Sequence, residues 1–124
     1  MMKNFLFLLL IISFVLAGCS EQKKLVFNGE SDNWSVNYIA QVHSSDSEEV
    51  DYTIRYIGEE PAPKTIDYQI GDDLVKGQSL NDKNNSVKKD GESCSGCAVT
   101  LEGDEIKMTI KWNENAETLT LTSD

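Results

Sequence analysis

The strongest constraint on the fold is an alternation of apolar and polar side chains with a period of two residues. It is clearest over residues 50–56, where Val50, Tyr52, Ile54 and Tyr56 are separated by polar residues. Successive side chains of a β-strand point to opposite faces of the sheet. The stretch therefore predicts a strand with one buried face and one solvated face.

The same alternation recurs along the chain, in segments separated by clusters of Gly, Pro, Asn and Asp. It predicts further strands at residues 25–27, 34–42, 66–70, 97–101, 106–112 and 118–121. Residues 71–96 carry few apolar side chains, so we interpret them as long loops around one or two weak edge strands, near Leu74-Val75 and Ser86-Val87. The last three strands are expected to form a meander.

These segments predict an all-β domain. No stretch after residue 18 has apolar side chains at helical spacing over three turns. Six to eight short strands in a domain of about 100 residues are typical of an immunoglobulin-like antiparallel β-sandwich, with a small β-barrel as the alternative. The aromatic side chains lie mostly on the inward phases and are assigned to the core: Trp34, Tyr38, Tyr52, Tyr56, Tyr68 and Trp112. Any that lie on an open sheet face would instead form a binding patch for a peptide or glycan.

The N-terminal segment has a different character. Lys3 gives a short positive start, and residues 5–17 are almost wholly apolar. A membrane-spanning helix needs about 20 such residues, so this run is too short to cross a bilayer. A charged start, an apolar middle and small residues at the end are typical of a secretory signal peptide, which we assign to residues 1–18.

The apolar run ends at Leu16-Ala17-Gly18-Cys19. This tetrapeptide resembles the lipobox of bacterial lipoproteins, which is a leucine, two small residues and a cysteine. The resemblance implies cleavage before Cys19, a diacylglyceryl group on its thiol, and acylation of the new amino terminus, with palmitate among the expected chains. Two chains anchor durably where one does not. The resemblance thus implies a protein held by lipid at the extracytoplasmic face of the cell membrane, the alternative being a free Cys19 thiol after ordinary secretory cleavage.

Removal of the leader leaves 106 of the 124 residues, which is enough for one domain. Residues 19–24 are the expected lipid-anchored tether, and residues 25–124 the expected single acidic β-domain. All 21 Asp and Glu follow the leader, whereas one of the 11 Lys and Arg, Lys3, lies within it, so the net charge changes from −10 to −11 on cleavage. This charge argues against nucleic acid as a partner and against a domain that lies flat on anionic lipid.

Two cysteines remain after Cys19, in Cys94-Ser95-Gly96-Cys97. An oxidising compartment allows them to form a disulfide. Residues three apart on a straight strand point to opposite faces, so the bridge needs the bend that Gly96 permits. We interpret Cys94 and Cys97 as a small structural disulfide that fixes the start of the strand at 97–101.

Other chemistry at the cysteine pair has less support. A thioredoxin-like site would place the pair at the start of a helix, whereas strand-like residues follow Cys97. A structural zinc site needs four ligands, and His43 is the one other strong candidate ligand. A Cu(I) site formed by Cys94, Cys97 and Met108 is conceivable, but Met108 shares its phase with inward apolar residues and is expected to pack in the core.

The remaining polar clusters are expected to be solvated. His43, Ser44 and Asp46 have the residue types of a catalytic triad, but neighbours on a polar turn rarely aim at one point. The acidic residues at 46–51 and 72–73 could gather Ca²⁺ loosely, although an acidic surface also serves solubility. No catalytic residue, metal site or cofactor is assigned.

Together these features predict a small bacterial surface lipoprotein that acts as a non-enzymatic binding or interaction module. Its partner is expected to be another envelope protein, a peptide or a wall component. The alternative is a thiol-redox or metal-handling lipoprotein that acts through Cys94 and Cys97.

Overall fold

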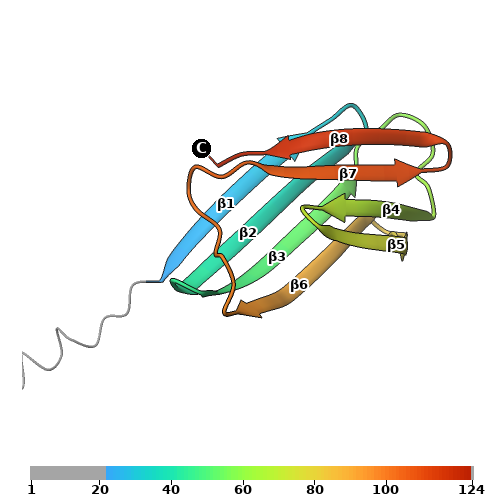
Figure 1. Cartoon of the computed structure of the whole chain (residues 1–124). Helices are drawn as coiled ribbons and strands as arrows, with labels where there is room; N and C mark the ends of the chain where they lie inside the picture. The colour runs from blue at the N-terminus through green and yellow to red at the C-terminus, as the bar shows by residue number, and fades with distance from the viewer. Residues whose placement is uncertain (1–21, 124) are drawn as a thin grey trace, which may run out of the picture.

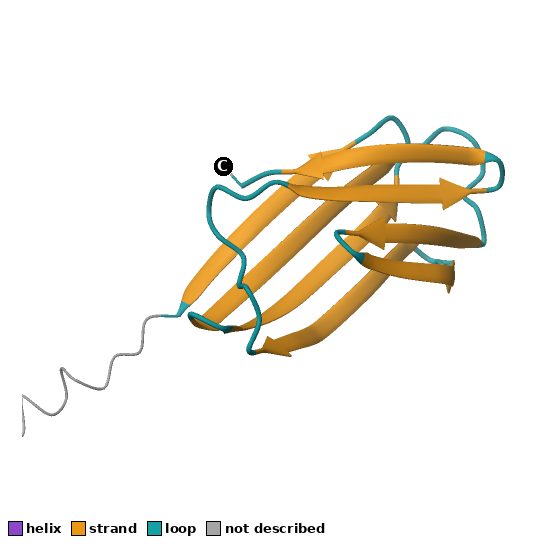
Figure 2. Cartoon of the chain, in the orientation of Figure 1, coloured by secondary structure: helices purple, strands orange, loops and turns teal. Residues whose placement is uncertain are grey.

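The computed structural model describes residues 22–123, and the regular secondary structure in that range consists of β-strands alone (Figure 1, Figure 2). The expected signal peptide and Cys19 lie outside the described residues. The eight strands are β1 (Lys23–Glu30), β2 (Trp34–Ser44), β3 (Ser47–Tyr56), β4 (Thr65–Ile70), β5 (Asp73–Ser79), β6 (Ser86–Ser95), β7 (Ile106–Trp112) and β8 (Asn115–Leu121).

The strands form two antiparallel sheets, with the strand orders β1-β2-β3-β6 and β5-β4-β7-β8, which pack face to face. The predicted all-β sandwich is therefore confirmed. Strands β1, β2 and β3 are consecutive neighbours in one sheet, whereas the corresponding sheet of an antibody constant domain contains strands A, B, E and D. The likeness to immunoglobulin domains is thus one of architecture.

The strand register places the inward side chains of neighbouring strands opposite one another. In the pair formed by β2 and β3, Trp34 lies opposite Tyr56, and Tyr38 lies opposite Tyr52. A shift of one residue would turn every apolar side chain of a strand toward solvent, so the alternation fixes this register.

The core lies between the two sheets. Its largest fully buried side chains are Trp34, Tyr68, Phe27, Ile54, Ile66, Met108, Ile110, Leu119, Leu121 and Val36. The Trp34 ring packs edge to face against Tyr56 and Trp112, at centroid distances of 5.1 and 5.4 Å. The assignment of the aromatic residues to the core is confirmed, except that Tyr38 is half-buried.

The structure corrects three of the predicted boundaries. Residues 97–101 form no strand, so the expected three-strand meander is reduced to the hairpin of β7 and β8. Residues 86–95 form a strand of ten residues where loops around a weak edge strand were expected. Strand β1 begins at Lys23, inside the segment that was assigned to the tether.

One flank of the sandwich is closed by contacts between β1 and β8. The backbone N–H groups of Asn28 and Thr122 each donate to the other's carbonyl, at 3.0 and 3.1 Å. Gly29 makes this approach possible, because a Cβ there would lie 2.8 Å from the carbonyl oxygen of Thr120. The opposite flank has β5 at the edge of one sheet and β6 at the edge of the other, and within residues 22–123 no hydrogen bond joins these two strands.

Candidate binding cleft

A cleft of about 970 Å³ opens on the flank between β5 and β6. Strands β1, β2, β3 and β6 extend beyond the ends of the shorter strands β4, β5 and β7, so part of the first sheet has no second sheet over it (Figure 1). The segment 96–105, which connects β6 to β7, runs along this uncovered part. The cleft lies between the overhang, the turn from β4 to β5, and this segment.

The floor of the cleft is aromatic and aliphatic. It continues the inward phases of the core and contains Tyr38, Val50, Tyr52, Ile70, Val75 and Ile106. The rings of Tyr38 and Tyr52 are stacked, with centroids 6.2 Å apart and an interplanar angle of 13°. The hydroxyl groups of Tyr52 and Tyr68 share a hydrogen bond of 2.7 Å across the two sheets.

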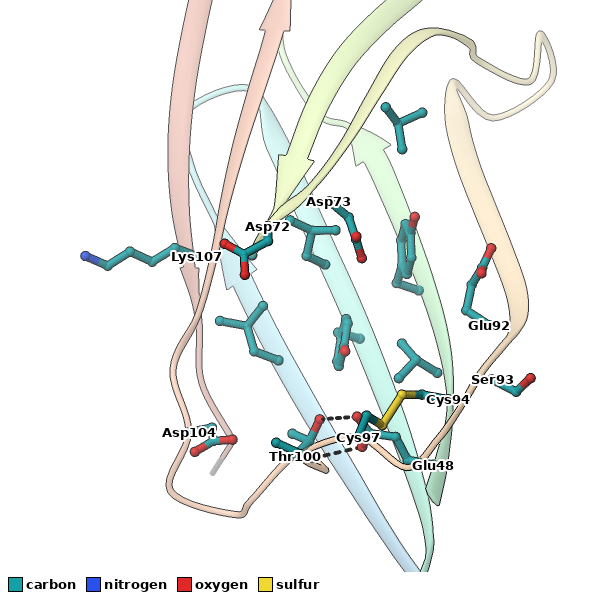
Figure 3. Close-up of a pocket in the computed structure, with 18 of the residues that line it drawn as sticks. Glu48, Asp72, Asp73, Glu92, Ser93, Cys94, Cys97, Thr100, Asp104 and Lys107 are labelled. Atoms are coloured by element: carbon teal, nitrogen blue, oxygen red, sulfur yellow. Dashed lines mark hydrogen bonds between the residues drawn. A yellow bond between two sulfur atoms is a disulfide. The ribbon is translucent and has the colours of Figure 1, made fainter. Parts of the chain in front are cut away.

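The walls of the cleft carry an excess of negative charge. They contain six carboxylates and one ammonium group, from Glu48, Asp72, Asp73, Glu92, Asp104, Glu105 and Lys107. Figure 3 shows the Asp73 side chain directed into the cleft and the Lys107 side chain directed away from it. The Lys107 ammonium therefore does not neutralise the interior.

Burial and the surrounding carboxylates keep the tyrosine hydroxyls protonated. Burial raises the pKa of Tyr52 well above its ordinary value, and the hydrogen bond with Tyr68 and the negative charges of Glu92 and Asp73 raise it further. Burial, followed by the charge of Glu48, also raises the pKa of Tyr38. Both phenols are thus neutral at physiological pH.

Glu48 attaches the segment 96–105 to the overhang. Its side chain is 8% exposed, and its two carboxylate oxygens accept hydrogen bonds from the backbone N–H and the hydroxyl of Thr100, at 2.9 and 3.1 Å. Nearby, the backbone N–H of Cys97 donates to the carbonyl of Asp46 at 3.1 Å. Buried charge needs such partners, so the pairing of Glu48 with Thr100 fixes one wall of the cleft.

Cys94 and Cys97 lie at disulfide distance on the same wall, with Cα atoms 6.2 Å apart. Cys94 belongs to β6, and Gly96 turns the chain with a φ of +73°, the left-handed conformation that glycine adopts readily. The bridge therefore joins β6 to Cys97, just past the end of that strand, and its expected place at the start of a strand is wrong because residues 97–101 form no strand.

The other predicted sites do not assemble. Met108 is fully buried in the core, and within residues 22–123 no three His, Cys, Asp or Glu side chains are placed to hold a metal ion. His43 is exposed, with Nε2 3.8 Å from Glu49 Oε2, while the Ser44 hydroxyl donates to Asp46. His43, Ser44 and Asp46 do not converge as a triad.

Sequence reasoning found parts of the cleft but did not bring them together. The sequence predicts Asp72 and Asp73 only as loose Ca²⁺ ligands and Thr100 only as part of a strand at 97–101, and it gives Glu92 no role. Glu48 offered one signal for the cleft in the sequence. It lies two residues before Val50, on the same inward face of β3 as Val50 and Tyr52. A charged residue on a buried phase is unusual and indicates a special environment.

No helix of the part described, residues 22–123, is long and apolar enough to cross a membrane. The chain has no significant match among protein-family models, curated proteins or solved structures.

Proposed function

We propose that the protein is a lipid-anchored, non-enzymatic binding module of the bacterial cell envelope, and that the cleft between the two sheets is its binding site. The observation that carries the proposal is the cleft, whose volume of about 970 Å³ is typical of sites that enclose a ligand. Its walls stand mainly on strands, and strands hold side chains more rigidly than loops do.

The geometry of the chain start complements lipid attachment at Cys19. Lys23, the first residue of β1, pairs with Val42, at the same end of the sandwich as Cys94, which pairs with Glu48 (Figure 1). A chain anchored at Cys19 has four residues, 19–22, before β1, which span about 14 Å when extended. The cleft would then face a partner close to the bilayer, such as another envelope protein, a peptide or a wall component.

Site-specific photo-crosslinking on living cells tests the binding site. Leu74 lines the cleft and is 59% exposed, whereas Val26 is an exposed apolar residue on the outward phase of β1. With a benzoylphenylalanine at either position, we expect a defined adduct from position 74 and none from position 26. Equal adducts from both positions, or none from position 74, would contradict a binding site in the cleft.

Mass spectrometry of the cellular protein tests the anchor. We expect a mature chain that begins at Cys19 and carries diacylglyceryl and acyl mass, and we expect Cys19→Ala to remove that mass and the protein's place in the membrane fraction. A wild-type chain that keeps residues 1–18 and carries no lipid would refute the anchoring proposal.

A thiol-exchange function is the second candidate, because the Cys94 and Cys97 pair is accessible on the cleft wall. The surrounding carboxylates count against it, since a thiolate forms most readily in electropositive surroundings. Incubation with a reduced dithiol peptide decides between the two candidates. Oxidation of one equivalent of the peptide to its disulfide, with Cys94 and Cys97 reduced to two thiols in exchange, favours thiol exchange, and an inert pair favours the binding module.

A further inference from the structure

The negative charge in the cleft is not neutralised by the protein itself. Within residues 22–123 the one ion pair of a lysine or arginine is Lys88 with Asp90, and both this pair and the contact of His43 with Glu49 lie outside the cleft. No described donor makes a hydrogen bond to the side chain of Asp73 or Glu92. Their charge is therefore available to a ligand and excludes an anionic one.

The floor of the cleft is suited to a long cationic side chain. The half-buried ring of Tyr38, which is stacked on the buried ring of Tyr52, presents aromatic surface, and a cation over such a ring is attracted to its π face. Val50 and Val75 offer apolar surface to a methylene stem. A bare metal ion would use neither feature.

The edges of the cleft are suited to a peptide backbone. Three consecutive residues of β5 (Asp73, Leu74 and Val75) and three of β6 (Glu92, Ser93 and Cys94) line it, and each strand is the edge of its sheet. An edge strand has main-chain N–H and C=O groups without a neighbouring strand, and an extended peptide can pair with them.

We propose that the cleft binds an extended basic peptide segment of a partner protein, with a lysine or arginine side chain between Asp73 and Glu92 and above Tyr38 and Tyr52. This inference rests on the proposed binding function and specifies its ligand. The charge of the cleft selects the cationic side chain, the tyrosine surface attracts its cationic group, Val50 and Val75 contact its stem, and the edges of β5 and β6 hold the backbone.

Calorimetric titration of the full-length chain in detergent micelles tests the ligand class. The probe is a ten-residue peptide that alternates lysine with valine, and two matched peptides carry norleucine or glutamate at the lysine positions. We expect the lysine peptide alone to bind, because norleucine keeps the stem and loses the charge. Binding of the norleucine peptide with equal affinity, or of spermidine as tightly as the lysine peptide, would overturn the proposal.

Two double variants separate a specific site from general electrostatic attraction. Asp73→Asn with Glu92→Gln removes two charges from the cleft and is expected to weaken binding of the lysine peptide about tenfold or more. Asp82→Asn with Glu114→Gln removes two exposed charges outside the cleft and is expected to leave affinity within about twofold, because exposed charges at a distance are screened by salt. Equal losses in both variants would show nonspecific attraction.

The photo-crosslinking experiment distinguishes failure of this inference from failure of the proposed function. An adduct from position 74 that maps to a basic segment, and is lost in the Asp73→Asn, Glu92→Gln background, supports both. An adduct that maps to a neutral or acidic segment keeps the binding module and overturns the basic peptide. The absence of any adduct, together with no peptide binding, overturns both.

Discussion

The two flanks of the sandwich solve the same structural problem in opposite ways. Where β1 meets β8, backbone hydrogen bonds, the close approach at Gly29 and the part-buried carboxylate of Glu117 join the two sheets. Where β5 faces β6, the sheets separate, and carboxylates line the gap. Stability is therefore expected to depend on the closed flank, whereas binding depends on the open flank. The core and one closed flank already join the two sheets, so the other flank is free to open into a cleft.

The largest effect on this comparison is expected from Gly29→Ala in the closed flank. The new Cβ would lie 2.6 Å from Leu121 Cδ2 and 2.8 Å from the Thr120 carbonyl, so β8 must move away from β1. Overpacking of this kind lowers the free energy of unfolding by about 3 kcal/mol. Urea unfolding followed by tryptophan fluorescence measures the loss.

The matched control for this variant is Gly103→Ala. No atom lies within 4 Å of a Cβ built at Gly103, and its backbone is not in the left-handed region. Its unfolding free energy should stay within about 0.5 kcal/mol of the wild type. Similar losses for the two alanine variants would show that the closed flank is not special.

A smaller effect is expected from the Cys94→Ser, Cys97→Ser double variant. A ring of four residues constrains little of the unfolded chain, so the loop-entropy relation extrapolates to about 2 kcal/mol of stabilisation at most. The local effect should be larger than the global one, because the bridge lies where β6 leaves the sheet. Hydrogen exchange should become faster in residues 96–105 and stay unchanged in β7. Uniform acceleration across both sheets would contradict the local role.

Glu117→Gln probes the polar part of the closed flank. Glu117 Oε1 accepts hydrogen bonds from the Ser31 hydroxyl at 2.6 Å and from the Asn33 backbone N–H at 3.0 Å, and Glu117 also accepts from the Asn33 side chain. The amide of glutamine cannot accept all three, and the partly exposed site limits the loss to about 1.5 kcal/mol. The control Glu114→Gln, on an exposed turn, should have little effect.

The effect of Glu117 should depend on pH in a defined direction. Burial alone raises the pKa of Glu117, but the hydrogen bonds from Ser31 and Asn33 outweigh it and lower the pKa below the usual 4.5. A carboxyl group with a lowered folded-state pKa stabilises the protein above the unfolded pKa, and that stabilisation is lost as the pH falls through the folded value. The difference in stability between wild type and Glu117→Gln should thus be full at pH 7 and shrink below about pH 4. A difference independent of pH would contradict this explanation.

The smallest effect on stability is expected from Asp73→Asn in the open flank. Asp73 has no partner among the described side chains, and it lies among other carboxylates, so its replacement removes repulsion. The unfolding free energy should change by less than about 0.5 kcal/mol, toward greater stability. A loss as large as that of Glu117→Gln would mean that the open flank also holds the fold together.

The sequence predicts a strand correctly where the inner face of that strand is covered by the other sheet. The prediction fails where the inner face has no second sheet over it. Strand β3 has an unbroken apolar inward phase from Val50 to Tyr56, because these side chains are buried in the core. Most of β6, the eight residues from Lys88 to Ser95, is exposed or half-buried where it pairs with β3, so nothing requires apolar side chains there. Its alternation is therefore absent, although its backbone is extended.

The opposite error occurs at residues 97–101. Cys97, Val99 and Leu101 alternate like a strand, but this segment crosses from one sheet to the other and pairs with neither. Leu101 is 62% exposed. Tertiary placement overrides local pattern here, and the contact of Thr100 with Glu48 spans 52 residues, so no local rule could predict it.

The cleft was beyond prediction for a related reason. Its carboxylates come from four separate parts of the chain, represented by Glu48, Asp73, Glu92 and Asp104, and only the fold brings them to one flank. The cysteine pair could be predicted, because its two members and the glycine between them are neighbours in the sequence.

The length of the hairpin formed by β4 and β5 determines how much of the first sheet is left uncovered. Each strand residue advances about 3.3 Å, so two more residues in β4 and in β5 would carry the hairpin about 7 Å further over Tyr38 and Val50. In a chain lengthened in this way, the hairpin would cover the cleft, and no ligand could enter between the two sheets. The length of the β4–β5 hairpin thus decides whether the cleft is open to a ligand or covered.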